Sequence, residues 1–272
     1  MCERRKTLGL VLGAGGARGA CHVGVIKMFE ENGIPIDYIA GSSMGAVVGA
    51  CYASGMSVDE MEQAVAKLKI SDIMDVNLRP VKAGGFFSGK KSAKLITNYL
   101  KVKTFEECKI PFRCVAVDLN RGEPYVFNQG KLIDGIRASL SIPGVFQPVK
   151  KGKMVLVDGG VLCRLPIDAL EEFAPDVIVL GDALGDHGEF LENPNIFQVL
   201  FRTFDVLDWK NTKKMYNRGD VVIVPKMDGS QFQIKTVKEA VTAGEKAAKS
   251  KINRIKKLLD LNKEVEENKE NK

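Results

Sequence analysis

The stretch LVLGAGGARGACHVGV, residues 10–25, places a glycine-rich turn directly after an apolar run and before a helical pattern. A nucleotide-binding loop, an oxyanion hole and a tight packing turn all put glycine between a strand and a helix. A dinucleotide fingerprint built on Gly13 and Gly15 needs a third glycine where this chain has Arg18, and no Gly-Lys-Ser/Thr follows as in a P-loop. An oxyanion hole needs only unhindered backbone N–H groups at a helix start, so it fits best.

A second glycine-flanked turn is GSSMG, residues 41–45, which follows the apolar residues 36–40 and precedes the small-residue helical run AVVGACYA. A G-x-S-x-G between a strand and a helix is typical of a nucleophile elbow, whose turn is so tight that the flanking residues must be nearly without side chains. Gly41 and Gly45 take these places. Ser43 would then stand at a helix N-terminus, where the helix dipole favours a developing negative charge.

A serine nucleophile needs a base, and the sequence offers several candidates. His22 lies in the first expected helix and is expected to be a packed structural residue, while His187 lies in a loop and leaves a Ser-His-Asp triad open as an alternative. Asp158, in MVLVDGG, ends an expected strand, and the two glycines after it let other backbone come close, so the sheet is expected to present this carboxylate at its carboxyl edge, beside the elbow. Asp118 and Asp182 also end expected strands, so position alone does not select among the three.

Short apolar runs rich in Val and Ile recur along the chain, as in strands buried on both faces of a sheet. They predict strands at residues 8–12, 38–40, 112–117, 125–127, 154–157, 177–180 and 221–224. Helices are expected at 19–32, 43–53, 58–68, 91–100, 194–216 and 237–261, the third opened by a capping box of Ser57 and Glu60. The alternation predicts a mostly parallel sheet with helices on both faces.

Composition favours one soluble globular domain. The chain has 272 residues, 45% hydrophobic and 27% charged, and no linker or repeat divides it. We expect a single domain over residues 1–261, followed by a disordered charged tail at 262–272. The net charge of +6 is concentrated around residues 90–103 and 238–257, where a solvated face is the simpler interpretation and an anionic lipid surface the alternative.

Several functional classes are disfavoured. The six cysteines lack C-x-x-C spacing and there are only two histidines, so we expect neither a metal nor another cofactor. Basic residues are not interleaved with aromatic ones, which argues against nucleic acid. No apolar run reaches the roughly 18 residues of a membrane span. The basic start resembles a signal peptide, but its apolar part is broken by glycines, so a cytoplasmic protein is expected.

Three separated blocks, GAGGARG, GSSMG and DGG, resemble in this order the signature blocks of the patatin-like phospholipases, and in particular their compact bacterial members. RASLSIPGVFQPV, residues 137–149, is similar to the block before the family's aspartate, and VAVDLNRGEPYVF, residues 115–127, to its central strand pair. The resemblance covers residues 8–166 and continues more loosely to the AGEKAA helix. The joint occurrence of the blocks is far more specific than any one of them.

This resemblance implies a three-layer α/β/α fold and a Ser-Asp dyad without histidine, in which Ser43 is the nucleophile and Asp158 the general base. It also implies that the glycine-rich loop supplies the oxyanion donors, from Gly15, Gly16, Ala17, Arg18 and Gly19. The family often has an asparagine a few residues after the DGG, where this chain has Cys163 and Arg164. The surroundings of Asp158 are therefore expected to differ.

The expected substrates are phospholipids, lysophospholipids or other fatty-acyl esters, cleaved through an acyl-enzyme. Peripheral contact with the inner membrane surface is a further expectation. Phe86 and Phe87, in GGFFSGKK, could form a flap that meets the membrane, or could be core residues under a loop. The alternative from another class is a catalytically weak protein that binds lipid or a partner on the same fold.

Overall fold

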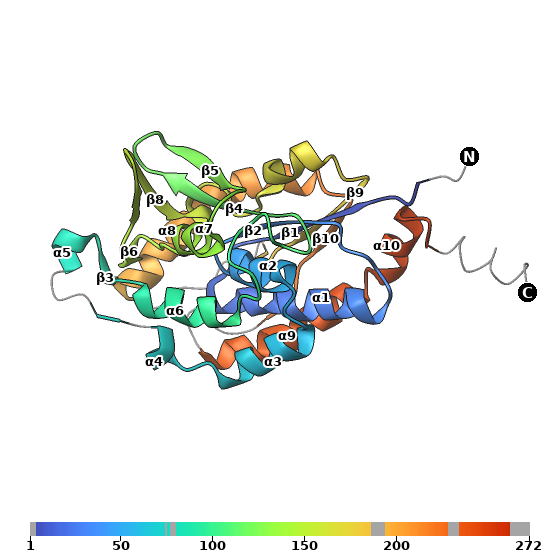
Figure 1. Ribbon diagram of the computed structural model, residues 1–272, viewed down its shortest axis with the longest axis horizontal. Helices are drawn as coiled ribbons and strands as arrows, with labels where there is room; N and C mark the ends of the chain where they lie inside the picture. The colour runs from blue at the N-terminus through green and yellow to red at the C-terminus, as the bar shows by residue number, and fades with distance from the viewer. Residues whose placement is uncertain (1–3, 74, 77–79, 186–193, 228–233, 262–272) are drawn as a thin grey trace, which may run out of the picture.

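The computed structural model describes residues 4–73, 75–76, 80–185, 194–227 and 234–261. Figure 1 shows a central sheet with helices on both sides. The strands are β1 (Leu8–Leu12), β2 (Tyr38–Ser42), β3 (Gly85–Phe87), β4 (Phe112–Asp118), β5 (Glu123–Phe127), β6 (Gly144–Phe146), β7 (Val149–Lys151), β8 (Met154–Asp158), β9 (Val177–Gly181) and β10 (Val221–Ile223).

The helices are α1 (Cys21–Glu31), α2 (Met44–Ser54), α3 (Val58–Lys67), α4 (Ile70–Ile73), α5 (Pro80–Ala83), α6 (Lys90–Tyr99), α7 (Leu132–Ser139), α8 (Ile196–Tyr216), α9 (Ile234–Lys249) and α10 (Ile252–Leu258). The described residues also form the 3₁₀ helices η1 (Gly16–Ala20), η2 (Gly159–Val161) and η3 (Ile167–Phe173). No helix in the described part of the chain is both long and apolar enough to cross a membrane.

The sheet separates two apolar clusters, because successive strand residues point to opposite faces. On β1, Leu10 and Leu12 join the larger cluster with apolar residues of α1, α2, α7 and α9. Val11 joins the smaller cluster on the other face, with Leu165 and the apolar residues of η3. The expected fold class, a three-layer α/β/α arrangement, is therefore confirmed.

Strands β1, β2, β4, β9 and β10 are parallel, in the order β10-β9-β1-β2-β4. Strand β5 is antiparallel to β4 over residues 114–118, while β2 pairs with β4 over 112–115 and β8 pairs with it over 116–118. The residues of β4 that pair with β5 also pair with β2 or with β8. Strand β5 therefore lies along one edge of β4, and β2 and β8 lie one after the other along the opposite edge. Strands β2 and β8 therefore approach that edge from opposite directions, and their carboxyl ends meet.

This junction corrects one expectation. We expected Asp158 to lie at the carboxyl edge of the parallel strands, but β8 is antiparallel to β4. Functional residues gather at the carboxyl ends of strands in parallel sheets, but the direction of β8 cannot be read from its own five residues. Asp158 still reaches the elbow, because Ser42 pairs with Val115 and Asp158 with the next residue, Ala116.

The helix boundaries also differ in places. The first expected helix begins as η1 and becomes α-helical at Cys21, and the last is split into α9 and α10 around Ser250 and Lys251. Residues 245–256 around the split contain neither glycine nor proline, so no local sequence signal predicts it. The short elements α4, α5, β3, β6 and β7 were not expected, because each is too short to show a period.

Candidate active site

Ser43 lies in a sharp turn between β2 and α2, with φ +53° and ψ −121°, a backbone conformation that non-glycine residues rarely adopt. A Cβ on Gly45 would lie 2.1 Å from the Leu12 carbonyl oxygen, and one on Gly41 would lie 2.6 Å from the Gly45 carbonyl oxygen. Both atoms are rigid backbone, so only glycine fits at either position. The turn places Ser43 at the N-terminus of α2.

The Ser43 hydroxyl donates to Asp158, with Oγ 2.6 Å from Oδ2. The other carboxylate oxygen, Oδ1, accepts from the Gly160 N–H at 2.7 Å. Both side chains are nearly buried, with exposed fractions of 3% for Ser43 and 5% for Asp158. Burial raises the pKa of Asp158 to about 7, against the smaller lowering effect of the two hydrogen bonds. The carboxyl group therefore exchanges its proton near neutral pH.

Two serines that the sequence analysis did not single out hold this pair in place. The Ser43 N–H donates to Ser139 Oγ at 2.9 Å, and Ser139 Oγ donates to the Val115 carbonyl oxygen at 2.7 Å. The Asp158 N–H donates to the Ser141 carbonyl oxygen at 2.9 Å. Both serines belong to RASLSIPGVFQPV, and the signal that could have found them is a pair of small hydroxyl residues at a helix end between apolar neighbours.

The glycine-rich loop lies beside the elbow. The N–H groups of Gly13 and Ala14 donate to the carbonyl oxygens of Gly181, at 2.9 Å, and Arg164, at 3.0 Å, which fixes the start of the loop. A Cβ on Gly19 would lie 2.6 Å from Met44 Cβ, so η1 packs closely against the first turn of α2. The loop backbone after Ala14 therefore lies next to the start of α2, where Ser43 stands.

A cavity of about 50 Å³ contains the pair. Gly15 and Gly16 line it together with Ser43 and Asp158, whereas Ala17, Arg18 and Gly19 are not among its lining residues. The other residues that line it are Ala14, Ile142, Pro143, Gly160, Val161, Arg164, Leu184, Phe204, Asp205 and Asp208. This volume corresponds to roughly two water molecules, each of which occupies about 30 Å³ in liquid water, so an acyl chain does not fit in this conformation.

His22 lies away from the pair and is buried. Its Nε2 is 2.8 Å from the Gly13 carbonyl oxygen, and burial lowers its pKa to about 4. The neutral ring donates to that carbonyl and so helps to hold the start of the glycine-rich loop, which agrees with the expected structural role. His187 lies outside the described residues.

The other two strand-ending aspartates have different partners. Asp118 accepts from the N–H groups of Asn120 and Val155, each at 3.1 Å, and so closes the β4–β5 turn. Asp182 is fully buried and pairs with Arg164, whose Nε lies 2.9 Å from Oδ1. Arg164 thus connects β9 to the glycine-rich loop, and Asp158 receives its support from Gly160 and Ser141 instead.

Phe86 and Phe87 lie on the small β3–β6 sheet. Phe87 packs against Phe146, with ring centroids 6.0 Å apart, while Phe86 is 49% exposed. One of the two is therefore partly a packing residue, and the other is available at the surface.

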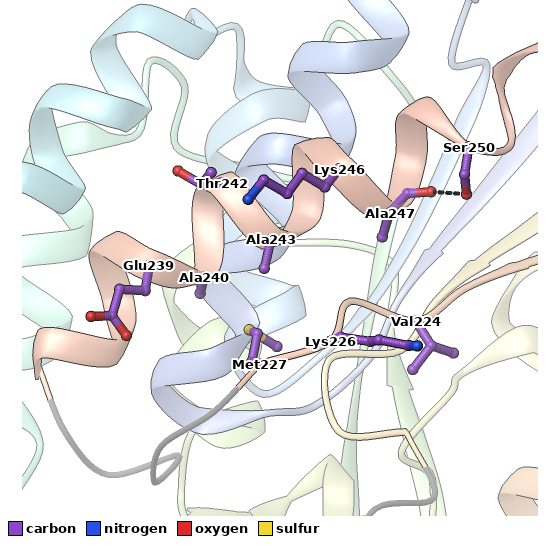
Figure 2. Close-up of a pocket in the computed structure, with 10 residues that line it drawn as sticks. All are labelled: Val224, Lys226, Met227, Glu239, Ala240, Thr242, Ala243, Lys246, Ala247 and Ser250. Carbon is purple, nitrogen blue, oxygen red and sulfur yellow. Dashed lines mark hydrogen bonds between the residues drawn. The ribbon is translucent and has the colours of Figure 1, made fainter.

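A larger cavity of about 660 Å³ lies elsewhere, between the end of β10 and α9 (Figure 2). Val224, Met227 and three alanines of α9 line it, with Lys226, Glu239 and Lys246 among its polar residues. It contains none of the residues predicted for the site. The small cavity is the one lined by both Ser43, the predicted nucleophile, and Asp158, the predicted base.

Comparison with known proteins agrees with the resemblance. A sequence model of the patatin-like phospholipase family matches residues 10–171. An uncharacterized NTE family protein of Mycobacterium tuberculosis is 37% identical over 170 residues, which cover 62% of this chain and 47% of that protein. Patatin-like phospholipase domain-containing protein 6 of Mus musculus is 32% identical over 181 residues, 65% of this chain and 13% of that protein. The chain thus spans about half the length of the mycobacterial relative, and less of the mouse protein.

Among solved structures, VipD from Legionella pneumophila has a similar fold, with a TM-score of 0.56 and 15% sequence identity over 95% of this chain and 67% of that chain. The matched family region begins in β1, contains the elbow and the DGG block, and ends in η3. Since the family model covers more than half of the chain, the protein belongs to the patatin-like phospholipase family.

Proposed function

We propose that this protein is a serine acyl hydrolase that cleaves carboxylic ester bonds of phospholipids or related lipids through a Ser43–Asp158 dyad. The observation that carries the proposal is the buried hydrogen bond from Ser43 Oγ to Asp158 Oδ2, at 2.6 Å. Family membership supports a lipid as the substrate class. Phospholipids, lysophospholipids and simpler fatty-acyl esters all present the same ester carbonyl.

The proposed reaction has two steps. Asp158 accepts the Ser43 proton while Oγ attacks the ester carbonyl carbon, and the tetrahedral intermediate then expels the alcohol, which takes the proton from Asp158. In the second step Asp158 accepts a proton from water, whose oxygen attacks the acyl-enzyme. The fatty acid leaves and Ser43 regains its proton.

The environment of Asp158 suits a base. A carboxylate with an ordinary pKa near 4 is a weak base at neutral pH, so it would accept the serine proton poorly. Burial raises the pKa of Asp158 to about 7, which strengthens the base while leaving about half of it ionised at that pH. Because Ser43 is held by Ser139 through its backbone, the hydroxyl is already directed at the carboxylate.

The intermediate carries a negative charge that needs donors. Gly15 and Gly16 line the same cavity as Ser43, and the N-terminus of α2 points at the same place. Their backbone N–H groups are the proposed oxyanion hole, together with the helix dipole. Since Gly13 and Ala14 already donate to other carbonyls, the donors come from later in the loop.

The test is the intact mass of the protein after exposure to an alkyl fluorophosphonate, which forms a stable adduct with an activated serine. We expect one adduct in the parent protein, none in Ser43→Ala, and strongly slowed labelling in Asp158→Asn. Asp118→Asn is the matched control, because Asp118 ends the neighbouring strand and caps a turn without touching Ser43. If Asp118→Asn slowed labelling as much as Asp158→Asn, Asp158 would not be the base.

The alternative, a catalytically weak lipid-binding protein on the same fold, predicts a different result. Such a protein would bind lipid but would give no adduct, either in solution or with vesicles present. Hydrolysis of a fluorescent phospholipid by the parent and not by Ser43→Ala would exclude it.

A further inference from the structure

Helix α8 forms part of the wall of the candidate site. It packs against η2, the turn that follows Asp158, and its residues Phe204, Asp205 and Asp208 line the cavity that contains Ser43. In this conformation the cavity holds about 50 Å³ and Ser43 is 3% exposed. A lipid ester can therefore reach Ser43 only when α8 or the residues facing it move.

The opposite side of α8 is apolar and open to solvent. Four of the eight large hydrophobic side chains that are exposed in the described part of the chain lie on this helix. They are Ile196 at 78%, Val199 at 48%, Val206 at 57% and Leu207 at 67% exposed. Val199, Val206 and Leu207 follow Ile196 by three, ten and eleven residues, which places all four on one side of a helix with 3.6 residues per turn.

The same side carries positive charge farther along. Lys210 and Lys214 follow Val206 by four and eight residues, so they lie on the same side of the helix, and both are exposed. Lys213 is also exposed and lies 5.1 Å from the centre of the Trp209 ring. The acidic residues of α8, Asp205 and Asp208, lie on the side that faces the cavity. The outer side of α8 is thus apolar in its first part, and the charged residues farther along it are lysines.

We infer that the outer face of α8 is a docking surface for an anionic phospholipid bilayer. Ile196, Val199, Val206 and Leu207 would enter the headgroup boundary while the three lysines contact lipid phosphates, an arrangement typical of interfacial amphipathic helices. Docking then draws α8 away from the cavity and admits the lipid ester to Ser43. This inference rests on the proposed function, because a lipid hydrolase has to bring its nucleophile to a lipid surface.

The chain contains its own probe of this movement. Trp209 is the single tryptophan and lies on α8, beside Arg164, whose guanidinium carbon is 5.6 Å from the ring centre. The test uses Ser43→Ala protein, which cannot cleave the lipid. It measures Trp209 fluorescence and co-sedimentation with vesicles of equal parts phosphatidylcholine and phosphatidylglycerol, and with vesicles of phosphatidylcholine alone. We expect binding and a change of emission with the anionic vesicles.

Two matched pairs of variants locate the surface. Lys210→Glu with Lys214→Glu should weaken vesicle binding by roughly tenfold or more, since each lysine near such a surface contributes about 1 kcal/mol. Lys246→Glu with Lys249→Glu changes the net charge equally on α9 and should bind like the parent. Leu207→Ser should weaken binding several-fold. Leu119→Ser, on an exposed apolar residue of the β4–β5 turn, should not.

The outcomes are distinct. Equal losses in both charge-reversed variants, or in both serine variants, would overturn the assignment to α8, and so would failure of the parent to bind anionic vesicles. A dimer in sedimentation velocity that Leu207→Ser dissociates, without vesicle binding, would identify a second copy of the chain as the occupant. Vesicle binding through α8 with no fluorophosphonate adduct in the Ser43-containing protein would refute the proposed function and leave the docking surface standing.

Discussion

Asp158→Asn should inactivate the protein and also make it more stable at alkaline pH. Burial raises the pKa of Asp158 from its ordinary value of 3.8 to about 7, so between these values the folded protein keeps a proton that the unfolded chain has released. Folding therefore becomes less favourable as the pH rises through this window, and the full cost is reached above pH 7. Asparagine has no charge to bury, so it avoids this cost.

The magnitude follows from the size of the shift. About three pKa units at about 1.4 kcal/mol each give a cost of about 4 kcal/mol at pH 8, and less than half of that at pH 5. The asparagine amide can still accept from the Gly160 N–H and donate to Ser43 Oγ, but a buried amide carries a desolvation cost of its own. We expect Asp158→Asn to be more stable than the parent by about 1–3 kcal/mol at pH 8, with a smaller gain at pH 5.

Urea denaturation of both proteins at the two pH values measures this difference. Comparing variant with parent removes the contribution of His22, whose burial lowers its pKa to about 4 in both proteins. An Asp158→Asn protein that is less stable than the parent at pH 8, or equally stabilised at both pH values, would refute the reasoning. The raised pKa of Asp158 would then be wrong, and the carboxylate would be only a weak base near neutral pH.

Three further predictions follow from the same geometry. Fluorophosphonate labelling of the parent should accelerate as the pH rises through about 7, because only ionised Asp158 accepts the Ser43 proton, and a rate that is constant from pH 5 to 9 would contradict this. Ser139→Ala removes the acceptor of the Ser43 N–H and should cost about 1–3 kcal/mol of stability while slowing labelling, with calorimetry and intact mass as the two measurements. Arg164→Met removes the cation that pairs with buried Asp182, which keeps hydrogen bonds from the Tyr216 hydroxyl and the Leu184 N–H, and should cost about 3–5 kcal/mol in urea denaturation, a loss that a simultaneous Asp182→Leu should largely reverse.

Much of the fold could be predicted because its local signals agree with each other. The strands of the parallel sheet are short apolar runs, and the helices between them carry period and caps, as at Ser57 and Glu60, where the expected capping box is present. The short strands β3, β6 and β7 have three residues each, too few for any pattern. The direction of β8 depends on how it pairs with β4, so it is a property of the tertiary structure.

The candidate site divides in the same way. Gly41 and Gly45 could be placed from the sequence because steric exclusion allows only glycine there: a Cβ at either position would lie 2.1–2.7 Å from three backbone atoms. The roles of Ser139 and Ser141 could not, because their partners lie 96 and 17 residues away and are reached only in the folded chain. The outer face of α8 was also hidden, since an apolar stripe in a sequence does not say whether it is covered.

The meeting of β2 and β8 on one edge of β4 has a consequence for how such proteins can diversify. Ser43 and Asp158 are 115 residues apart in the chain, yet their separation in space is set by two adjacent positions of one strand, Val115 and Ala116. Because pairing with β4 determines the distance between Ser43 and Asp158, loops between the two residues can lengthen or shrink without changing that distance. Insertions at the β7–β8 turn around Gly152 should therefore reshape the surroundings while the pair stays in register.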